Sequence, residues 1–583
     1  MADLHPPHTK ETAVESSYPS SVNSVSKSAD PSVMAPATAH AEPKTTMDNK
    51  EIALVDEKSE AVFPSSDLEE DTAEYPKGWK LGLISVALCL AVFCMALDNT
   101  IIATAIPRIT DHFHALDDVG WYVSVYLLTT CSFQLIFGKL YTFYSIKWVF
   151  LSALLVFEVG SVVCATAPTS NALIVGRAIA GVGSAGIFSG AILIVTYTVP
   201  LSQRPLYTGF IGGMYGIASV AGPLMGGAFT DNPKLTWRWC FYINLPFGLV
   251  TAVFIFIFFK SPKRAKIQST IIQQLDAMDL PGTIVFLPGV VCLLLALQWG
   301  GTKYTWGSGR IIALLVVSAL LIITFVVLQF FRGEKATVPP RVFKNRNIWS
   351  TAVFAAFLGG SFFVMMFYLP IWFQAIKGAS AVKSGIMSLP FILGMVIFSI
   401  IAGGVITTTG YYTPFMYLSA VLIPIGAGLL STLQPDSGHA KWIGYQAIFG
   451  FGTGAGFQQP LLAAQACLPL ADIPIGTAIM MFSQILGGAI IASVGQNVFT
   501  NQLVQNLIKS VPGINPSIVL AAGATELKRD VPSQFYNDVL IAYNKAIDQT
   551  FYVSVAMGAL CAFPLIFVQW KSVKGKQIST AAV

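Results

Sequence analysis

The sequence predicts an all-α integral membrane protein with fourteen transmembrane helices. Of its 583 residues, 54% are hydrophobic and only 11% are charged, whereas charged residues make up about 25% of an ordinary soluble domain. From Trp79 onward the chain is a series of apolar segments, each roughly 18 to 28 residues long and able to cross a hydrocarbon core of about 30 Å. Composition and segment length therefore place most of the chain in a lipid bilayer.

Residues 1–76, before the first segment, are rich in Ser, Thr, Pro, Ala and acidic residues and contain no apolar run long enough for a signal peptide. Such a composition buries too little apolar surface to fold. We predict a disordered cytoplasmic tail. It either serves regulation or trafficking through phosphorylatable serines, or is a solvated extension.

The predicted spans follow the tail in series, with one long outer loop at 500–550 before the last. In order they are 81–107, 119–140, 148–167, 172–196, 206–229, 239–259, 279–299, 310–331, 348–374, 384–408, 413–432, 441–465, 474–499 and 551–569. An even number of spans puts both termini on one side of the membrane. Lys and Arg near the span ends are concentrated on that side, which predicts that both termini are cytoplasmic.

Three ionisable residues lie well inside predicted spans: Asp98, Glu158 and Arg177. Because a charge in the membrane costs about 2.5 to 3.5 kcal/mol, we predict that they couple proton movement to function. The alternatives are a structural hydrogen-bonding group for Asp98 and a snorkelling or permanently protonated side chain for Glu158. Arg177 is interpreted as the counter-charge of a carboxylate, or else as a fixed clamp between helices.

The fifth span, 206–229, is rich in glycine. At about 100° per helical residue, most of its glycines share one face with Pro223. Another helix can pack closely against such a face, and the proline removes a helical hydrogen bond. We predict a helix that bends or slides without titrating, with its hinge at Gly216, Gly222, Pro223, Gly226 and Gly227.

The last six predicted spans contain aromatic and neutral polar residues and no comparably buried carboxylate. Proton coupling is therefore expected in the first six spans alone. Aromatic faces with a few amides suit a large apolar ligand, whereas the alternative for each aromatic residue is packing against lipid. The predicted substrate pocket consists of Trp121, Tyr126, Gln134, Phe363, Phe367, Gln374, Gln458 and Gln484.

Several function classes are excluded by the same composition. The net charge of +5 is too small to suggest nucleic acid as a partner. The eight cysteines show no CxxC spacing, so we predict neither a metal site nor disulfides. The chain has no GxxxxGK[ST] loop for ATP and no nucleophile placed beside a base, so we predict that it is not an enzyme.

Several motifs, in order along residues 79–570, resemble those of the major facilitator superfamily. The likeness is to the fourteen-span drug:proton antiporter branch, which includes fungal toxin and multidrug efflux pumps. The motifs are LDNTIIATAIP with Asp98, GRAIAGVGSAG with Arg177, the antiporter element GPLMGG at 222–227, the branch signature Trp237, Arg238, Trp239, Asn244 and Pro246, and LLALQWGGTKYTW near 293–306.

One motif departs from the family pattern. The loop between the second and third spans usually reads like GxLADRxGRR, but here it runs from Gly138 and Lys139 to Lys147 with no acidic residue. We still expect these three residues at an inner gate. The charge-relay form of the gate is in doubt, and Tyr and Thr hydroxyls are a neutral substitute that predicts a less salt-sensitive gate.

The resemblance implies two six-helix bundles, spans 1–6 (77–260) and 9–14 (347–570), with spans 7 and 8 inserted between them (261–346) and a cytoplasmic tail at 571–583. It implies proton-coupled efflux of small hydrophobic molecules through a site between the bundles. The proton gradient would be the driving force, with no cofactor, and the protein would work as a monomer in the plasma membrane or, alternatively, the vacuolar membrane. The rival functions are uptake of a nutrient or siderophore, and a non-transporting receptor.

Overall fold

The computed structural model describes residues 75–574, apart from 116–117, 233, 262–275, 302, 521–526, 528 and 530. All of these residues belong to one compact unit, Val62–Val583. The predicted tail at 1–76 lies outside the described residues except for its last two positions, and the predicted tail at 571–583 is described only to 574.

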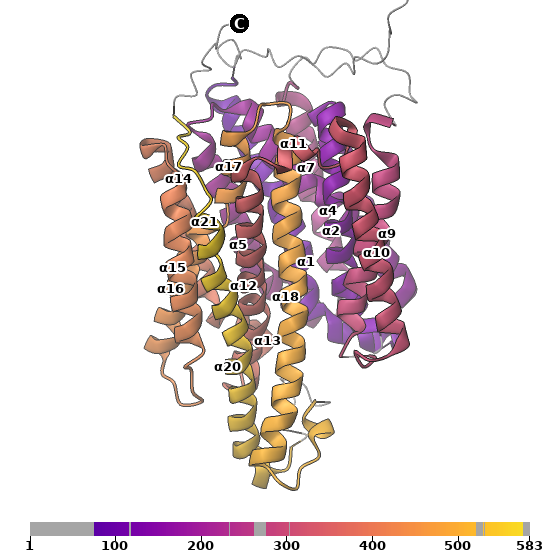
Figure 1. Cartoon of the computed structure of the whole chain (residues 1–583). Helices are drawn as coiled ribbons and strands as arrows, with labels where there is room; N and C mark the ends of the chain where they lie inside the picture. The colour runs from indigo at the N-terminus through magenta and orange to yellow at the C-terminus, as the bar shows by residue number, and fades with distance from the viewer. Residues whose placement is uncertain are drawn as a thin grey trace, which may run out of the picture. The chain divides into compact units, whose positions relative to one another are not determined.

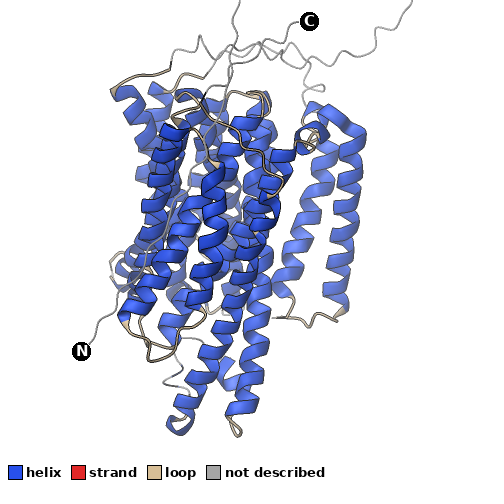
Figure 2. Ribbon diagram, turned by 60° about the vertical axis from the view of Figure 1, so that its left-hand side comes forward, coloured by secondary structure: helices blue, strands red, loops and turns tan. Residues whose placement is uncertain are grey.

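The described residues form helices and no strand (Figure 2). The first set of helices is α1 (Trp79–Phe113), α2 (Val119–Phe143), α3 (Ile146–Thr166), α4 (Ser170–Thr198), α5 (Arg204–Asp231), α6 (Trp239–Tyr242) and α7 (Asn244–Phe258). The middle of the chain forms α9 (Leu280–Trp299), α10 (Gly309–Arg332), η3 (Gly333–Lys335) and α11 (Pro340–Phe343).

The second set begins after α11. It consists of α12 (Arg346–Ala375), α13 (Ala381–Met387), α14 (Leu389–Thr409), α15 (Thr413–Leu430), α16 (His439–Gly456), α17 (Gln459–Cys467), α18 (Ile473–Ser510), η4 (Ser533–Phe535), α20 (Tyr536–Leu560) and α21 (Ala562–Leu565). The long helices run alongside one another, and α18 and α20 project together beyond the rest at the bottom of Figure 1.

Twelve helices in the described part of the chain are long and apolar enough to cross a membrane. They make the protein a multi-pass membrane protein. Helix occupies every predicted range, but α5 and α16 are not among the twelve, because their many glycines lower the hydropathy. The count of fourteen spans stays a prediction.

The helices pack extensively within each set, and one of the buried apolar clusters extends across both sets. In the first set α3 packs on α4, α1 on α5 and α2 on α4, while in the second α12 packs on α18, α14 on α16 and α18 on α20. The sets meet along two seams, α5 against α14 and α2 against α18. The hairpin of α9 and α10 lies beside the second seam, where α9 contacts both α2 and α18.

Glycines on α5 allow the helices of the first seam to pack closely together. A Cβ at Gly209 would come within 2.9 Å of the Ser399 carbonyl oxygen of α14. On another side of α5, a Cβ at Gly226 would lie 2.2 Å from the Thr104 hydroxyl of α1. The glycines therefore let α5 approach two helices at once, and the helix continues through Pro223.

The end of the chain differs from the prediction. The sequence predicts an outer loop at 500–550, but α18 continues to Ser510 and α20 already begins at Tyr536. Polar residues in 536–550 lower the hydropathy there. Apolar Val539, Ala542, Ala546 and Ile547 are nevertheless buried at helical spacing, so this stretch is an amphipathic helix that packs on the second set.

We call the two ends of the helices the tail face and the loop face. The tail face holds the start of α1 and the end of α21, and the loop face holds the end of α18 and the start of α20. The start of α2 therefore lies towards the loop face and its end towards the tail face.

Candidate functional site

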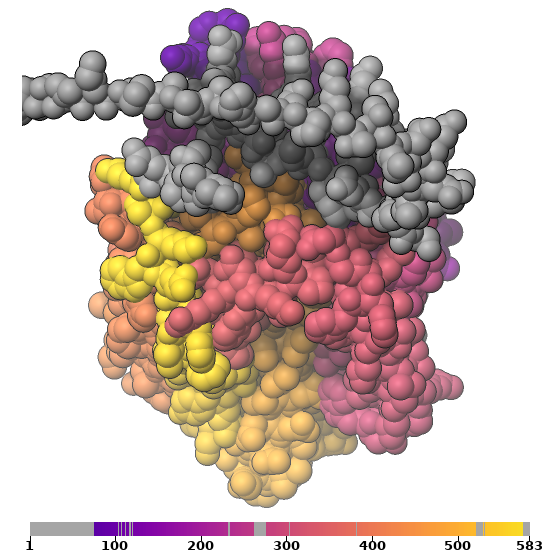
Figure 3. Space-filling view, turned by 45° about the horizontal axis from the view of Figure 1, so that its top comes forward, coloured from indigo at the N-terminus to yellow at the C-terminus, as the bar shows by residue number. Residues whose placement is uncertain are grey.

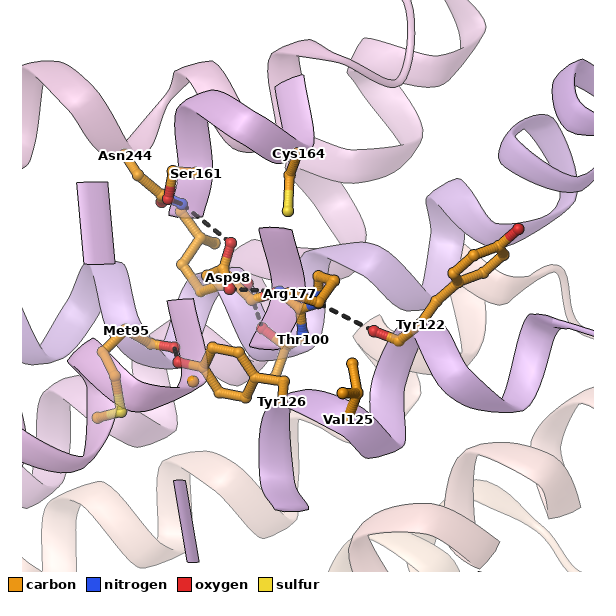
Figure 4. A network of polar contacts seen from close by, with 12 residues as sticks. Met95, Asp98, Thr100, Tyr122, Val125, Tyr126, Ser161, Cys164, Arg177 and Asn244 are labelled. Carbon is orange, nitrogen blue, oxygen red and sulfur yellow. Dashed lines mark hydrogen bonds and ion pairs between the residues drawn. The ribbon is translucent and has the colours of Figure 1, made fainter. Parts of the chain in front are cut away.

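Asp98 of α1 and Arg177 of α4 form a fully buried ion pair in the first set of helices (Figure 4). Arg177 Nη1 contacts Asp98 Oδ2 and also donates to the Asp98 carbonyl oxygen at 3.2 Å. Its Nε donates to the Tyr122 carbonyl oxygen at 2.9 Å, and the guanidinium lies 4.4 Å from the Tyr126 ring centroid. Arg177 thereby joins α1, α2 and α4.

Asn244, at the start of α7, completes the surroundings of Asp98. Its Nδ2 donates to Asp98 Oδ1 at 3.0 Å and to the Ser161 hydroxyl of α3 at 3.2 Å (Figure 4). Both oxygens of the carboxylate are thus engaged. The sequence predicts Asn244 only as part of a signature, since a separation of 146 residues gives no sign in one sequence that it meets Asp98.

Small residues in α4 allow this arrangement. A Cβ at Gly181 would come within 2.5 Å of the Tyr126 carbonyl oxygen, and one at Gly183 within 2.4 Å of the Phe157 backbone nitrogen. The helix can therefore approach α2 and α3 closely enough for Arg177 to reach the backbone of α2.

Glu158 does not join this network. It lies half-buried on α3, and within the described residues neither of its carboxylate oxygens has a hydrogen-bond partner. It packs on Gly248 of α7, where a Cβ would come within 1.8 Å of its Oε1. A proton-coupling role for Glu158 stays a prediction.

The rest of the predicted signature forms a clamp on the end of α3. Arg238 Nη1 donates to the carbonyl oxygens of Ala165 at 2.8 Å and Ala167 at 3.0 Å, and its guanidinium lies over the Trp237 ring. A cation is favourable at the C-terminus of a helix. Trp239 and Pro246 are exposed, so only part of the signature faces the protein interior.

Two cavities lie between the two sets of helices. The larger, about 550 Å³, lies between the loop-face end of α2 and the middle of α18, and the smaller, about 60 Å³, lies deeper along α2. Leu127, Phe363 and Ile485 line both, so the cavities are neighbours.

Six of the eight predicted pocket residues line these cavities. The larger is lined by Trp121, Phe363 and Phe367, and the smaller by Tyr126, Gln134, Phe363 and Gln484. Gln374 and Gln458 line neither. Gln374 donates to the Ser384 hydroxyl at 3.0 Å, and Gln458 packs against Gly212 of α5.

Three amide side chains line the smaller cavity, those of Asn99, Gln134 and Gln484. Gln134 and Gln484 are buried, and Gln134 Oε1 and Gln484 Nε2 have no hydrogen-bond partner in the described part of the chain. A buried polar atom without a partner costs about 1 to 3 kcal/mol. These two atoms, an acceptor and a donor on opposite seam helices, are suited to hydrogen-bonding a ligand.

At the tail face the second seam is closed. A Cβ at Gly138 would come within 2.6 Å of the Ala478 Cβ, so α2 and α18 are in contact there. Lys139 is buried, and its Nζ donates to the Lys335 carbonyl oxygen in the linker at 3.3 Å. Lys147 does not face this seam, because its Nζ donates to the Phe256 carbonyl oxygen of α7 at 2.5 Å.

The linker between α10 and α12 brings charged side chains to this closed end, and no motif in the sequence predicts it. Arg341 donates to both carboxylate oxygens of Asp472, at 2.7 and 3.2 Å, directly before α18. It also pairs with Glu334, 3.1 Å away. Figure 3 shows the pink-red segment after α10 lying across this face beside the orange residues around α17 and α18. The gate motif itself has no acidic residue, and the acids at this face are Glu334 of the linker and Asp472 before α18, both paired with Arg341.

Asp279 anchors the linker to α9. This buried carboxylate accepts hydrogen bonds from the Gln329 amide, from the Thr337 hydroxyl and backbone, and from the Gly282 backbone. The Arg332 Nε is 3.3 Å away. The carboxylate therefore ties together the start of α9, the end of α10 and the linker.

Asp548 of α20 corrects the prediction that the last spans hold no buried carboxylate. Only 8% of its surface is exposed. Asn544 Nδ2 donates to its Oδ2 at 2.8 Å and to the Leu433 carbonyl oxygen at 2.9 Å, while Trp372 Nε1 donates to Asn544 Oδ1 at 2.7 Å. The prediction failed because Asp548 falls in the stretch taken for a loop.

The comparisons with known proteins agree with this architecture. The family model of the Major Facilitator Superfamily matches residues 88–492. The chain is 57% identical over 530 residues to the MFS-type efflux pump MFS1 of Trichophyton rubrum, covering 91% of this chain and 98% of the relative. It is 55% identical over 502 residues to the efflux pump roqT of Penicillium rubens, with coverages of 86% and 93%. It is 50% identical over 523 residues to the efflux pump aflT of Aspergillus parasiticus, with coverages of 89% and 99%.

Solved structures share the fold. The proton:xylose symporter XylE superposes with a TM-score of 0.55 at 15% identity, covering 84% of this chain and 96% of that structure. The human organic anion transporter MFSD10 superposes with a TM-score of 0.54 at 13% identity, covering 84% and 99%. These likenesses concern the fold alone. From the family match, the relatives and the helical architecture together, we conclude that the chain is a membrane transporter, not an enzyme, and belongs to the Major Facilitator Superfamily.

Proposed function

We propose that this protein exports small hydrophobic molecules from the cytoplasm in exchange for protons. The observation that carries the proposal is the buried pair of Asp98 and Arg177 beside a cavity lined by aromatic rings and amides. Relatives covering most of the chain are named efflux pumps. Because Asp98 of α1 is paired with the permanent charge of Arg177 of α4, protonation of Asp98 would change the packing of these two helices.

The coupling follows from the ion pair. When Asp98 takes up a proton, its attraction to Arg177 is lost while Arg177 keeps its charge, so the contact between α1 and α4 weakens. Asn244, which donates to Asp98, links the same event to α7. Protonation and substrate drive a transport cycle only if they favour different states of the protein.

The arrangement of the α2/α18 seam supports an outward-facing state, whereas α5 contacts α14 and α13 along its length. We propose fourteen spans with α5 and α16 among them and both termini in the cytoplasm, so the tail face is the inner face. The α2/α18 seam is then closed inside at Gly138 and Ala478 and holds the larger cavity outside. We expect the protein to act as a monomer in the plasma membrane.

The test is transport in proteoliposomes with an imposed pH gradient. The purified protein should move an aromatic dye against its gradient only when protons flow in the opposite direction. Asp98→Asn should insert normally but lose at least about 100-fold of this energised transport, the size of effect expected for a proton-transfer group. The matched control is Asp538→Asn, at an exposed position of α20. Full pH-driven export by the Asp98 variant, or dye movement in the same direction as protons, would refute the proposal.

A further inference from the structure

The inserted hairpin contributes a wall to the larger cavity. The cavity is enclosed by α2, α12 and α18, which belong to the two packed sets, and on its fourth side by α9. From α9 and the loop after it come Leu294, Leu297, Gln298, Trp299 and Lys303. Helices inserted between two bundles would be expected to face lipid, yet the end of α9 faces a cavity of about 550 Å³.

The side chains of α9 in the cavity have partners across it. The rings of Trp299 and Trp121 of α2 lie 5.9 Å apart with 75° between their planes. A Cβ at Gly120 would come within 3.5 Å of Gln298 Nε2, so the amide lies directly against α2 where that helix has no side chain. The absence of a side chain at Gly120 leaves room for the Gln298 amide beside the Trp pair.

The hairpin is fastened to α18 and not merely adjacent to it. Trp306 Nε1, after α9, donates to Asn497 Oδ1 of α18 at 2.8 Å. Deeper in the molecule the Phe286 and Phe482 rings lie 5.4 Å apart. By contrast α10 exposes much of its surface, including Phe331 at 84%. Within the hairpin, α9 is thus the packed helix and α10 the outer one.

The charged and polar residues that line the larger cavity indicate which class of ligand it would bind. Among the described residues that line it, Lys303 is the only one that carries a charge, and its side chain is exposed. The remaining polar groups are hydroxyls and amides, including Ser124, Gln298 and Gln496. Tyr368 donates to Gln496 Oε1 at 2.9 Å. With aromatic walls, an exposed cation and no acid among these lining residues, the cavity favours flat rings with acceptor oxygens or an acidic group.

We infer that α9 is part of the substrate-binding site, where Trp299 and Gln298 select planar aromatic substrates and Lys303 favours those that carry an acidic or oxygen-rich group. The inference rests on the proposed export function and deepens it. The inserted pair of helices thereby sets substrate selectivity, in addition to covering the α2/α18 seam.

The test measures KM and kcat for three dyes in proteoliposomes. Sulforhodamine B and rhodamine 6G share a xanthene ring system but carry opposite net charge, and Nile red is planar and neutral. The parent protein should transport sulforhodamine B with a lower KM than rhodamine 6G. Trp299→Leu should raise KM for all three dyes about five-fold, as expected for the loss of one aromatic contact. Lys303→Gln should raise KM about three-fold for sulforhodamine B alone, the size of an exposed charge contact.

The control is Trp148→Leu, at an exposed tryptophan of α3 away from both cavities; it should keep the parental KM for all three dyes. Binding of sulforhodamine B to purified protein, followed by fluorescence anisotropy, gives a second readout if a variant no longer transports. Parental KM and Kd in both Trp299→Leu and Lys303→Gln, or a lower KM for rhodamine 6G in the parent, would overturn the inference while leaving export intact. If the parent transports none of the dyes, the proposed export of hydrophobic molecules fails, and this inference fails with it.

Discussion

The two halves of the molecule each bury an aspartate beside an asparagine, but they surround it differently. In the first half Asp98 accepts from Asn244 and pairs with Arg177, and no part of it is exposed. In the second half Asp548 accepts from Asn544, and in the described part of the chain its Oδ1 has no partner. One carboxylate is thus tied to a permanent charge across three helices, and the other to a neutral amide on its own helix.

This difference indicates different roles for the same residue types. Asn544 is also held by Trp372 and Leu433, at the loop-face ends of α12 and α15. That cluster joins three helices of one set, which is a structural task. The Asp98 cluster lies beside the Tyr126 ring, which lines the smaller cavity. We therefore expect the charge of Asp98 to be needed for transport in the first half, and Asp548 to serve helix packing in the second.

The largest effect is expected from Arg177→Leu. It leaves Asp98 buried without its counter-charge, and breaking a buried pair destabilises a protein by about 3 to 5 kcal/mol. Thermal unfolding of the purified protein measures the loss. The double variant Arg177→Leu/Asp98→Asn should regain part of that stability, because no uncompensated charge remains. A single variant as stable as the parent would mean that the pair contributes nothing to the first half.

The next effect is expected at the contact between α5 and α1. Gly226→Leu forces a side chain against Thr104 and the Ile101 carbonyl oxygen, 2.2 and 2.7 Å from the new Cβ. Overpacking of this kind costs about 1 to 3 kcal/mol. Because α5 also forms the seam with α14, we expect turnover to fall about ten-fold or more, with all dyes affected alike.

The control for this variant is Gly404→Leu in α14, where nothing lies within 4 Å of a new Cβ; it should leave turnover unchanged. A change in selectivity alone in Gly226→Leu would contradict the hinge interpretation and would place α5 in the substrate pocket.

A smaller effect is expected at the tail face, where the linker joins the halves. The Arg341 and Asp472 side chains form a partly exposed pair, and such pairs contribute about 0 to 1 kcal/mol and are screened by salt. Arg341→Gln should therefore modestly increase the fraction of protein in which α2 and α18 are separated at the tail face. The measurement is labelling of a cysteine introduced at Ala478, which faces Gly138.

The dependence of labelling on salt distinguishes this charged gate from the neutral, hydroxyl-based gate that the sequence predicts. Labelling of the parent should rise with ionic strength, and labelling of Arg341→Gln should not. The charge-swapped pair Arg341→Asp/Asp472→Arg should restore protection in part. Protection that is independent of salt in the parent would favour the neutral, hydroxyl-based gate.

The smallest effect is expected from Asp548→Asn in the second half. The introduced amide would keep an acceptor oxygen for Asn544 and would leave the contacts to Trp372 and Leu433 in place. The free energy of unfolding should change by about 1 kcal/mol at most, the size of one hydrogen bond. For the same reason the transport rate should stay within about two-fold of that of the parent. Loss of pH-driven transport in this variant would remove the distinction between the halves.

Much of the fold could be predicted because long apolar segments leave few alternatives. Helix occupies each predicted range, and Asp98 and Arg177 stand out in the sequence because charges inside apolar spans are rare. Asp548 was missed for the converse reason, since the polar residues around it hide an amphipathic helix from a hydropathy argument.

The other features that could not be predicted from the sequence are contacts between residues far apart in the chain. Nothing in one sequence shows that Asn244 meets Asp98, that Trp299 meets Trp121 or that Arg341 meets Asp472. The α9 helix is apolar like any membrane span, and only its packing against α2 and α18 shows that one end of it faces a cavity.

The most direct test of the account is substrate-driven proton movement. Proteoliposomes loaded with the pH dye pyranine receive Nile red, and the internal pH is followed for the parent, Asp98→Asn and Asp548→Asn. The account predicts proton movement in the parent and in Asp548→Asn, and none in Asp98→Asn. Parental proton movement in Asp98→Asn, or its loss in Asp548→Asn alone, would contradict the assignment of proton coupling to the first half.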